Sequence, residues 1–238
     1  MRLTKTSLNG DANLIAHYPF DGNSNDASGG GRNGTDSNIS YVGGKWASAA
    51  DGNGTTSDID VASFSSDFLA TGGSIAGWIY IDTMANSKRI LQLDDGNTAA
   101  LITTNASGPD CSLGFTHFCD VTDGIWRTTD RVLSSGGWYH IGITYDRSGG
   151  VGENPIIYIN GVSVGVTETQ TPVAPLRTSI DQINFLSDGA GSAFLDAKID
   201  DWVFFTREIT VGEMAELAAG EPPSGNAIFF STGGLTLA

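Results

Sequence analysis

Residues 74–81 read SIAGWIYI, a run in which apolar side chains occupy both alternating sets of positions. Ile75 and Ile79 fall on one side of an extended strand, whereas Trp78 and Tyr80 fall on the other. A strand with two apolar faces is typically covered on both sides, because an exposed face would carry polar residues. The stretch therefore predicts a central strand in a layered β structure.

Similar segments recur along the chain. They are short, rich in β-branched and aromatic residues, and separated by Asn-Gly, Asp-Gly and Gly-Gly sequences that favour turns. The expected strands are residues 14–20, 74–81, 89–93, 99–104, 138–146, 155–165, 181–187 and 198–206. This pattern predicts an all-β protein built as a sandwich or a barrel.

Two local signals add detail. Asn160-Gly161 lies between alternating runs and predicts a tight hairpin, because a type I′ turn needs positive φ at both central positions. Thr210 and Glu213 form a capping-box pattern ahead of VGEMAELAA, and Gly220 follows as a stop signal. We therefore expect one short helix near the C-terminal end of the domain.

Composition limits the classes of partner. The chain has 238 residues, 39% of them hydrophobic, with 27 acidic and 12 basic residues and a formal net charge of −15. Such a charge repels phosphate backbones and anionic membranes, so binding to nucleic acid is not expected. Membrane insertion is not expected either, because no apolar run approaches the roughly 20 residues of a membrane-spanning helix. Residues 1–14 contain no apolar segment typical of a secretory signal.

Catalytic motifs match only in part. GVSVG at 161–165 resembles a nucleophile elbow, but Ser163 lies inside a predicted hairpin instead of a strand-to-helix turn. GGGRNG at 29–34 fits a dinucleotide-binding pattern, but no helical period follows it. The glutamates never form the paired-acid pattern of sandwich glucanases. We therefore expect a protein without enzymatic activity.

Aspartate outnumbers glutamate by 21 to 6. Short carboxylates suit turns, where they accept backbone N–H groups, and they also suit calcium. Asp200 and Asp201 are adjacent in the predicted strand KIDDWVFF, so alternation places one of them on a face with Trp202 and Phe204. A carboxylate on a packed face needs a partner. That partner is either a metal ion or a set of backbone N–H groups, and the residues alone leave both open.

The chain contains, in this order, LIAHYPFDGNSNDASGGGRNGT, GSIAGWIYI, GGWYHIGITYD, PIIYINGVSVG and AKIDDWVFFTREITVGEMAEL. Together these segments resemble laminin G-like (concanavalin A-like) jelly-roll domains. The resemblance implies two antiparallel sheets in a jelly-roll sandwich, with the first and last strands as neighbours. The expected domain is 14–220, between an N-terminal arm (1–13) and a strand-like C-terminal extension (221–238). The chain departs from the family at Trp202, which replaces a small aliphatic residue.

The same resemblance implies one structural calcium ion, because many family members hold calcium where the first and last strands meet. Asp21 matches the aspartate of the family's F-D-G turn, and Asp200 and Asp201 match its I-D-D/E pair. Asn23 and Asp26 are further oxygen ligands offered by the same loop.

Family members usually bind glycans, proteins or matrix components. A solitary domain with apolar extensions is also similar to phage virion components such as head-decoration or tail-fibre proteins. We expect a non-catalytic binding or structural module at a virion surface, assembling with copies of itself or with other structural proteins. Its candidate assembly residues are Ile228, Phe229 and Phe230. The alternatives are a lectin-like adhesion module, extracellular or at a cell surface, and then a glycosidase or lyase.

For the lectin-like alternative, the candidate glycan-binding residues are Trp126, Asp123 and Arg127 in VTDGIWRTTD. An exposed aromatic ring stacks on sugars, although the same ring packed in the core is the other interpretation of Trp126. Cys111 and Cys119 flank SLGFTHF. A hairpin there would permit a disulfide, but a chain without an export signal favours free thiols.

Overall fold

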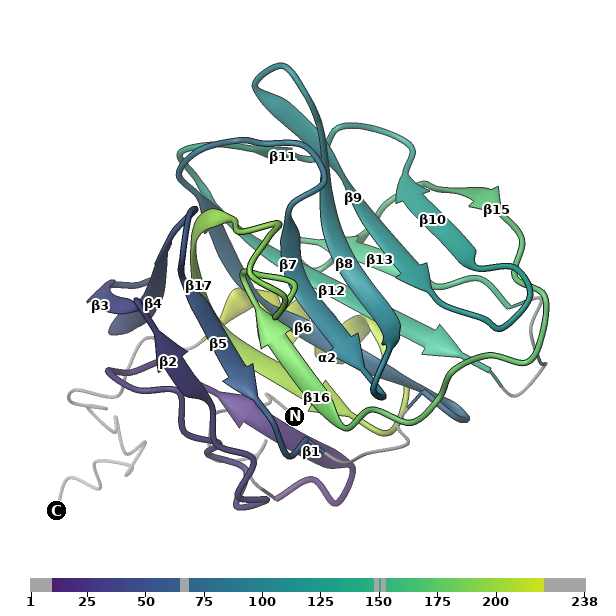
Figure 1. Cartoon of the computed structure of the whole chain (residues 1–238), viewed down its shortest axis with the longest axis horizontal. Helices are drawn as coiled ribbons and strands as arrows, with labels where there is room; N and C mark the ends of the chain where they lie inside the picture. Colours follow the sequence, from purple (N-terminus) through teal and green to yellow (C-terminus); the bar gives the residue numbers. More distant parts are fainter. Residues whose placement is uncertain (1–9, 65–68, 148–149, 151–152, 221–238) are drawn as a thin grey trace, which may run out of the picture.

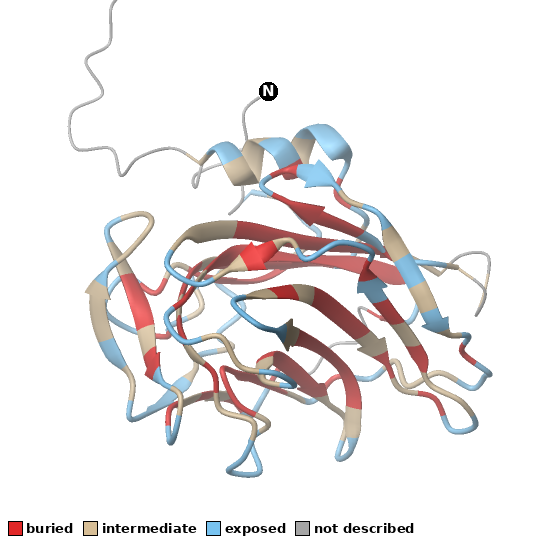
Figure 2. Cartoon of the chain, turned by 90° about the horizontal axis from the view of Figure 1, so that it is seen from above, coloured by how far each residue is buried: buried red, intermediate tan, exposed pale blue. Residues whose placement is uncertain are grey.

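The computed structural model describes residues 10–64, 69–147, 150 and 153–220. The described part consists of two β-sheets packed face to face, with one helix, α2 (Val211–Ala219), outside one of them (Figure 2). The sheet that carries the helix is termed the back sheet, and the other, which faces the viewer in Figure 1, is termed the front sheet. The expected all-β, antiparallel two-sheet sandwich with one short helix is confirmed.

The back sheet has 8 strands. Their order is β14 (Val162–Ser163), β13 (Ile156–Ile159), β12 (Trp138–Asp146), β6 (Gly72–Ile81), β17 (Asp196–Phe205), β4 (Ser48–Asn53) and β3 (Ser40–Gly43), with β1 (Leu14–Tyr18) also paired to β17. Strand β6 contains the SIAGWIYI stretch and lies between β12 and β17, with every residue except Tyr80 buried. The prediction of a central strand covered on both faces is confirmed.

The front sheet has 9 strands. Their order is β15 (Val166–Gln170), β10 (Gly124–Thr128), β9 (Asp110–His117), β8 (Thr98–Ser107), β7 (Arg89–Asp94), β16 (Gln182–Phe185), β5 (Asp58–Val61) and β2 (Thr35–Ser37), with β11 (Leu133–Ser134) paired to β9. Neighbouring strands in both sheets are antiparallel. Each strand can therefore present one face to the core and the other to its surroundings.

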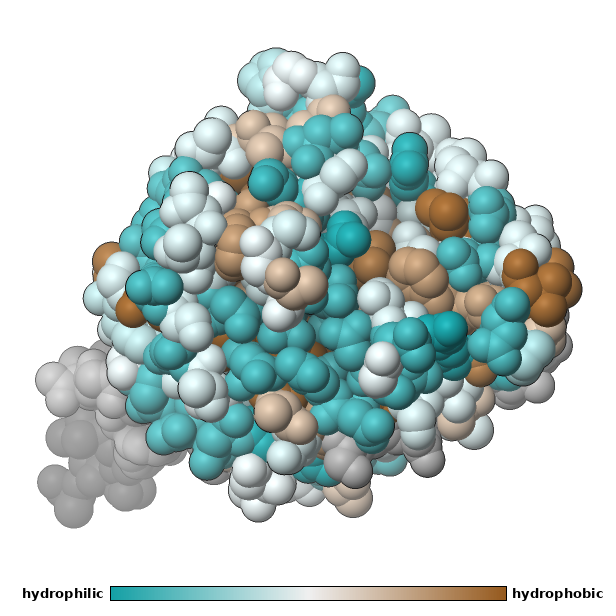
Figure 3. All heavy atoms as spheres, in the orientation of Figure 1, coloured by the Kyte–Doolittle hydropathy of each residue, from teal (hydrophilic) through white to brown (hydrophobic). Residues whose placement is uncertain are grey.

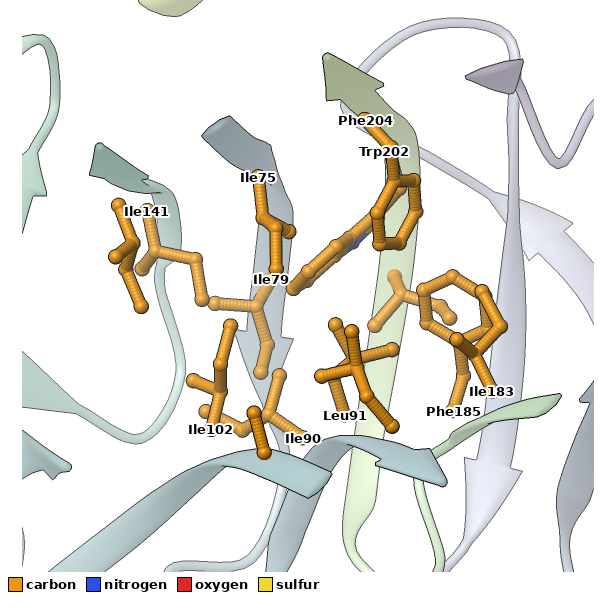
Figure 4. Packing of buried hydrophobic residues seen from close by; sticks show 14 of the residues in the cluster. Ile75, Ile79, Ile90, Leu91, Ile102, Ile141, Ile183, Phe185, Trp202 and Phe204 are labelled. Carbon is orange, nitrogen blue, oxygen red and sulfur yellow. The ribbon is translucent and has the colours of Figure 1, made fainter. Parts of the chain in front are cut away.

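The core lies between the sheets and is built from alternate residues of their strands (Figure 4). Ile79 of β6 and Trp202 of β17 come from the back sheet, and Leu91 of β7 and Phe185 of β16 come from the front sheet. The rings of Phe185 and Trp202 meet edge to face, with centroids 5.5 Å apart at 79°. Aromatic pairs favour this geometry, so the contact stabilises the sandwich beyond simple burial.

The first and last strands of the domain are neighbours, as the resemblance implied, because β1 pairs with β17. The register between β17 and β6 shifts between Asp200 and Val203, and Asp201 has a φ of +52°. This β-bulge changes which residues share a face. Ile199 and Trp202 both belong to the core cluster, although strict alternation would place them on opposite faces. Asp200, which follows Ile199 directly, points away from the core. The expectation of strict alternation along KIDDWVFF is therefore wrong.

Helix α2 covers part of the outer face of the back sheet (Figure 2). The expected capping box is confirmed, since Thr210 and Glu213 each accept a hydrogen bond from the other's backbone N–H. Met214 is fully buried and lies over Gly142 of β12, where a Cβ atom would approach its Sδ to 2.3 Å. Glycine at this position therefore lets the helix rest directly on the sheet.

The hairpin between β13 and β14 is also confirmed. Asn160 and Gly161 have φ values of +52° and +80°, as a type I′ turn requires. Among the described residues, no helix is long and apolar enough to cross a membrane.

Part of the expected N-terminal arm contacts the domain. Asp11 Oδ2 accepts from Arg207 Nη2 at 2.7 Å, and the Asn13 carbonyl accepts from the Thr206 amide at 2.9 Å. Arg207 also donates to both carboxylate oxygens of Glu213 at 2.7 Å, so it links the chain before β1 to the helix. Residues 11 and 13 are thereby attached to the sandwich.

Candidate functional site

The aspartates expected to bind calcium lie at the bulge of β17 and around one turn. Asp200 is fully buried, and its Oδ2 accepts from the Trp46 amide at 2.8 Å. Asp21 Oδ1 accepts from the Ser48 amide at 3.2 Å. Asp21 and Asp200 therefore both hold the turn between β3 and β4. Asp201 is directed to β1, where its Oδ1 lies 3.1 Å from His17 Nε2.

The other two expected ligands serve the loop after β1. Asp26 accepts from the amides of His17, Ser28 and Arg32 at 2.9 to 3.1 Å. Burial raises the pKa of its carboxyl, but these hydrogen bonds outweigh it and the pKa is lowered overall. Asn23 Oδ1 accepts from the Asn25 amide at 2.9 Å.

The sequence left open whether these carboxylates bind a metal ion or backbone N–H groups. In the structure, backbone N–H groups donate to Asp21, Asp26 and Asp200. Within the described part of the chain, His, Cys, Asp and Glu side chains form no group of three or more that could hold a metal ion. A calcium ion at this junction stays a prediction from the family resemblance. Asp21 and Asp200 are linked there through amides of neighbouring residues, Ser48 and Trp46.

The expected glycan-stacking residue is in the core. Trp126 is fully buried on β10, its ring stacks on Phe115 with centroids 5.9 Å apart, and its Nε1 donates to Asn154 at 2.6 Å. Asp123 accepts from the Cys119 amide at 3.0 Å, which ties up this carboxylate in a turn. Trp126 cannot stack on a ligand, so the interpretation as an exposed ring is wrong.

Arg127 is exposed and, by alternation, points to the face opposite Trp126. The expected binding residues are therefore not brought together. The assembly residues expected at Ile228, Phe229 and Phe230 lie outside the described residues.

The two cysteines are free and buried. SLGFTHF is not a hairpin: Cys111 and His117 belong to one straight strand, β9, and Cys119 follows it. Six steps along a strand cover about 20 Å at roughly 3.3 Å per residue. Since a disulfide requires Cα atoms within about 7 Å, the alternative of a bridge is wrong. Burial raises the pKa of the Cys111 thiol to about 11, which makes it unreactive near neutral pH.

A set of polar residues that the sequence analysis did not single out covers the outer face of the front sheet. Because Phe185 of β16 points into the core, its neighbour Asn184 points outward. Asn184 lies opposite Gln92 of β7 and Asp60 of β5, and directly paired residues share a face. Figure 3 shows that this side of the molecule is largely hydrophilic.

Amide side chains on this face donate hydrogen bonds to carboxylates. The pairs are Gln182 with Asp60 (2.8 Å), Asn184 with Asp58 (3.3 Å) and Gln92 with Asp94 (3.2 Å). Arg89 Nε donates to Gln92 Oε1 at 3.1 Å, which holds the Gln92 amide in the orientation that donates to Asp94. Neutral amides do not cancel the charge of their partners, so the face is negative.

The carboxyls near Asn184 reflect this field. Burial raises the pKa of Asp58, and the charges of Asp60 and Asp188 raise it further, although hydrogen bonds from Ser187 and Asn184 oppose this. Burial likewise raises the pKa of Asp94. The pKa of both carboxyls is therefore raised, because ionisation would add negative charge to a partly buried surface that is already negative.

Two turns form a pocket of about 290 Å³ on this face. One is the β7–β8 turn and the other follows β16. The pocket is lined by Asp94, Gly96, Asn97, Thr98, Gln182, Asn184, Asp188, Gly189 and Ala190. This volume is close to the lower limit of about 300 Å³ for small-molecule sites.

Asn184 provides an oxygen that the described residues leave without a donor. The side chain is 1% exposed, and its Oδ1 accepts no hydrogen bond from the described residues. The amide cannot be reversed at no cost, because Nδ2 donates to the Asp58 carboxylate and a flip would place Oδ1 there instead. A buried acceptor without a donor is costly, so this oxygen favours a water molecule or a ligand.

The sequence did carry a signal for this surface. RILQLD, DIDV and QINF place Asp or an amide at alternate positions in strands whose other face is apolar. Alternation predicts a polar face for each strand separately. Which strands lie side by side is set by long-range pairing, so the sequence did not predict the cluster.

The model of the concanavalin A-like lectin/glucanases superfamily matches residues 51–215. The chain belongs to this family. The match covers the central strands, the front-sheet pocket and most of α2, and so agrees with the sandwich described above. No curated protein matches the chain.

Solved structures with the same fold come from several proteins. Domain 4 of an extracellular arabinanase from Geobacillus stearothermophilus, in complex with arabinotriose, is 20% identical with a TM-score of 0.63, and the match covers 87% of this chain and 98% of that one. The binding domain of botulinum neurotoxin DC in complex with SialylT is 17% identical with a TM-score of 0.64, over 90% of this chain and 52% of that one. Trypanosoma rangeli sialidase is 13% identical with a TM-score of 0.62, over 86% of this chain and 32% of that one. Identities this low show the fold alone.

Proposed function

We propose that the protein is a non-catalytic carbohydrate-binding module that binds glycans with the outer face of its front sheet, at strands β7, β16 and β5. The observation that carries the proposal is the pocket beside Asn184, where a buried, unused carbonyl oxygen lies among carboxylates. Binding sites are typically concave and contain a few convergent polar groups. Sugar hydroxyls supply the donors that these oxygens lack.

The comparisons support this function over assembly into a virion. Two proteins of the same fold are seen with saccharide-type ligands, namely the arabinanase domain with arabinotriose and the neurotoxin binding domain with SialylT. The virion-surface role stays a prediction, because its expected contact residues lie outside the described part. A glycan-binding module acts where glycans are displayed, which is consistent with an extracellular, cell-surface or virion-surface location.

Our expectation that the protein does not catalyse rests on the chemistry of the face. Glycoside hydrolysis needs one carboxylic acid that donates a proton and a second carboxylate placed across the scissile bond. The Asp58 and Asp94 carboxyls are each engaged by an amide of the protein. We therefore expect binding without turnover.

The test is a glycan array probed with the whole chain, including neutral arabino-oligosaccharides and acidic sialyl-oligosaccharides. The best glycan is then titrated into isotopically labelled protein, and the shifted backbone amides are mapped. We expect the shifts to concentrate in β7, β16 and β5.

Trp138→Ala is the matched control, since Trp138 is a partly exposed aromatic residue on the back sheet, beside Tyr80. Its affinity should equal that of the unchanged protein. Amide shifts centred on β6 and β12, or an affinity lost in the Trp138 variant, would move the site to the back sheet and contradict the proposal.

A further inference from the structure

We infer that the front-sheet pocket holds a single terminal residue of a neutral glycan, which donates two neighbouring hydroxyl groups to Asn184 Oδ1 and the Asp94 carboxylate. This inference rests on the proposed function and specifies the ligand class for the same face.

The size of the pocket favours one sugar residue over a length of chain. Its volume of about 290 Å³ suits a small ligand, and both walls are short turns. Small residues, Gly96, Gly189 and Ala190, form part of the lining, and all three are exposed. A ring can therefore enter from solvent with one edge down, while the rest of the glycan stays outside.

The contacts available are hydrogen bonds, not ring stacking. None of the described lining residues is aromatic. The floor instead presents oxygen acceptors. They are Asn184 Oδ1, which the described residues leave without a donor, and the Asp94 carboxylate, which accepts from Gln92 Nε2 at 3.2 Å to each oxygen and from the Thr98 side chain. A carboxylate has about four acceptor sites, so Asp94 retains capacity. Neighbouring hydroxyls on a sugar edge are the matching donors.

Charge excludes acidic sugars. Asp94 and Asp188 line the pocket, and Asp58 and Asp60 lie beside it on β5. Two cations lie nearby and are engaged by the protein. Arg89 is half-buried and donates through its Nε to Gln92, and Arg177 donates through its Nη1 to the Thr98 carbonyl at 3.3 Å and lies 3.9 Å from Asp95. An incoming uronate, sialate or sulfate would meet the like charges of at least two carboxylates in the pocket. Neutral sugars avoid this repulsion.

Gly189 lies directly against the buried acceptor. Its φ is +64°, and a Cβ atom there would lie 2.7 Å from Asn184 Oδ1. Any other residue would press against the oxygen that the ligand must reach. The turn after β16 is itself held by Asp188, whose Oδ1 accepts from the Ser192 amide at 2.8 Å, so the glycine is positioned independently of the ligand.

The test measures affinities by calorimetry for the best neutral glycan, its analogues that each lack one terminal hydroxyl, and an acidic analogue oxidised at the same residue. We expect removal of either of two adjacent hydroxyls to weaken binding by roughly tenfold to a hundredfold, as for loss of hydrogen bonds to polar or charged acceptors. The acidic analogue should bind at least about tenfold more weakly.

Variants identify the acceptors. Asn184→Leu and Asp94→Asn should each reduce affinity about tenfold or more, whereas Thr116→Ala, on β9 of the same face but outside the pocket, should not. Melting curves establish that each variant is folded. The deoxy analogues test the inference on the unchanged protein if Asn184→Leu fails to fold.

The outcomes separate the two claims. Glycan binding with amide shifts on the front sheet but with full affinity in a folded Asn184 variant, or tighter binding of the acidic analogue, overturns the inference and leaves the proposed function standing. A chain that binds nothing on the array overturns both.

Discussion

The two outer faces of the sandwich differ in what covers them. On the back sheet, α2 buries an apolar cluster that includes Tyr158, Val203 and Phe205, and Trp78 packs there against His140 with ring centroids 5.3 Å apart. On the front sheet, the outward residues of β7, β16 and β5 are amides and carboxylates, with a pocket between two turns.

The difference shows how one domain separates stability from binding. An apolar face must be covered, and the helix that covers it also makes this part of the face unavailable to a ligand. A face of carboxylates paired with amides needs no cover, because most of its polar groups, though not Asn184 Oδ1, are satisfied by one another and by solvent. Substitutions on the back face should therefore change stability, and those on the front face should change binding.

The largest expected effect comes from Met214→Ala. Met214 is fully buried between α2 and Gly142, so truncation leaves a cavity and should lower the free energy of unfolding by about 2–5 kcal/mol. Urea denaturation measures this change. Glycan affinity should be the same as in the unchanged protein.

Thr116→Ala on the front face is the control and should change stability by about 0.5 kcal/mol or less. A Met214 variant as stable as this control would mean that the helix does not rest on the sheet.

The second effect is a loss of stability in mild acid. Burial lowers the pKa of His140 to about 3 and that of His117 to about 4. The unfolded chain binds these protons below pH 6.5 whereas the folded chain does not, so stability falls as pH drops from about 6.5 toward 4. Each histidine contributes up to about 1.4 kcal/mol per pH unit.

Thermal melts from pH 7 to 4.5 measure this slope, and His140→Phe should make it shallower. An equal slope in the variant would show that His140 is accessible to protons in the folded state.

The third effect involves the ion pair at the start of α2. The hydrogen bond from Arg207 holds the pKa of Glu213 below its usual value, although burial opposes it. The resulting stability is present above the unfolded pKa of about 4.5 and is lost as pH falls through the lower folded pKa. Glu213→Ala also removes the cap, so it should cost about 1 kcal/mol at pH 7 and less near pH 3.

Glu208→Gln provides the contrast. Burial and the charges of Asp146 and Glu153 raise the pKa of Glu208, so neutralising it should not reduce stability at pH 7. Equal losses in the two glutamate variants would argue against the Arg207 contact.

The smallest effect is a gain on the front face. Since the folded pKa of Asp58 is raised, its charge opposes folding above that pKa. Asp58→Asn keeps an acceptor for Ser187 and Asn184 and should stabilise the protein by about 0.5 kcal/mol at pH 7. The gain should shrink as pH falls through the folded pKa of Asp58, where the unchanged protein becomes protonated. A loss of stability at pH 7 would show that the negative charge itself is needed there.

Local signals in the sequence predicted much of this fold. The Asn160-Gly161 hairpin and the Thr210–Glu213 capping box depend on φ preferences and on hydrogen bonds between near neighbours, so both could be predicted from a few residues. The central position of SIAGWIYI followed from apolar residues on both of its faces.

Interactions between distant residues were harder to foresee. The side of the sheet on which Trp202 lies depends on the bulge at Asp201, because one extra residue reverses the alternation that follows it. Trp126 lies in a turn-rich sequence, but Phe115 of β9 and Asn154 bury its ring and satisfy its N–H. Neither partner is near it in the sequence.

The sequence by itself determined the all-β class, the positions of roughly half of the described strands, and the hairpin turn and helix cap, because these follow from side-chain periodicity and from backbone preferences of single residues. The family followed from the resemblance of whole segments. Only the tertiary structure decided which polar side chains meet. Asn184, Gln92 and Asp60 lie on separate strands, and strand order brings them to one face through backbone pairing that no side-chain pattern encodes. The candidate binding surface is therefore a product of topology.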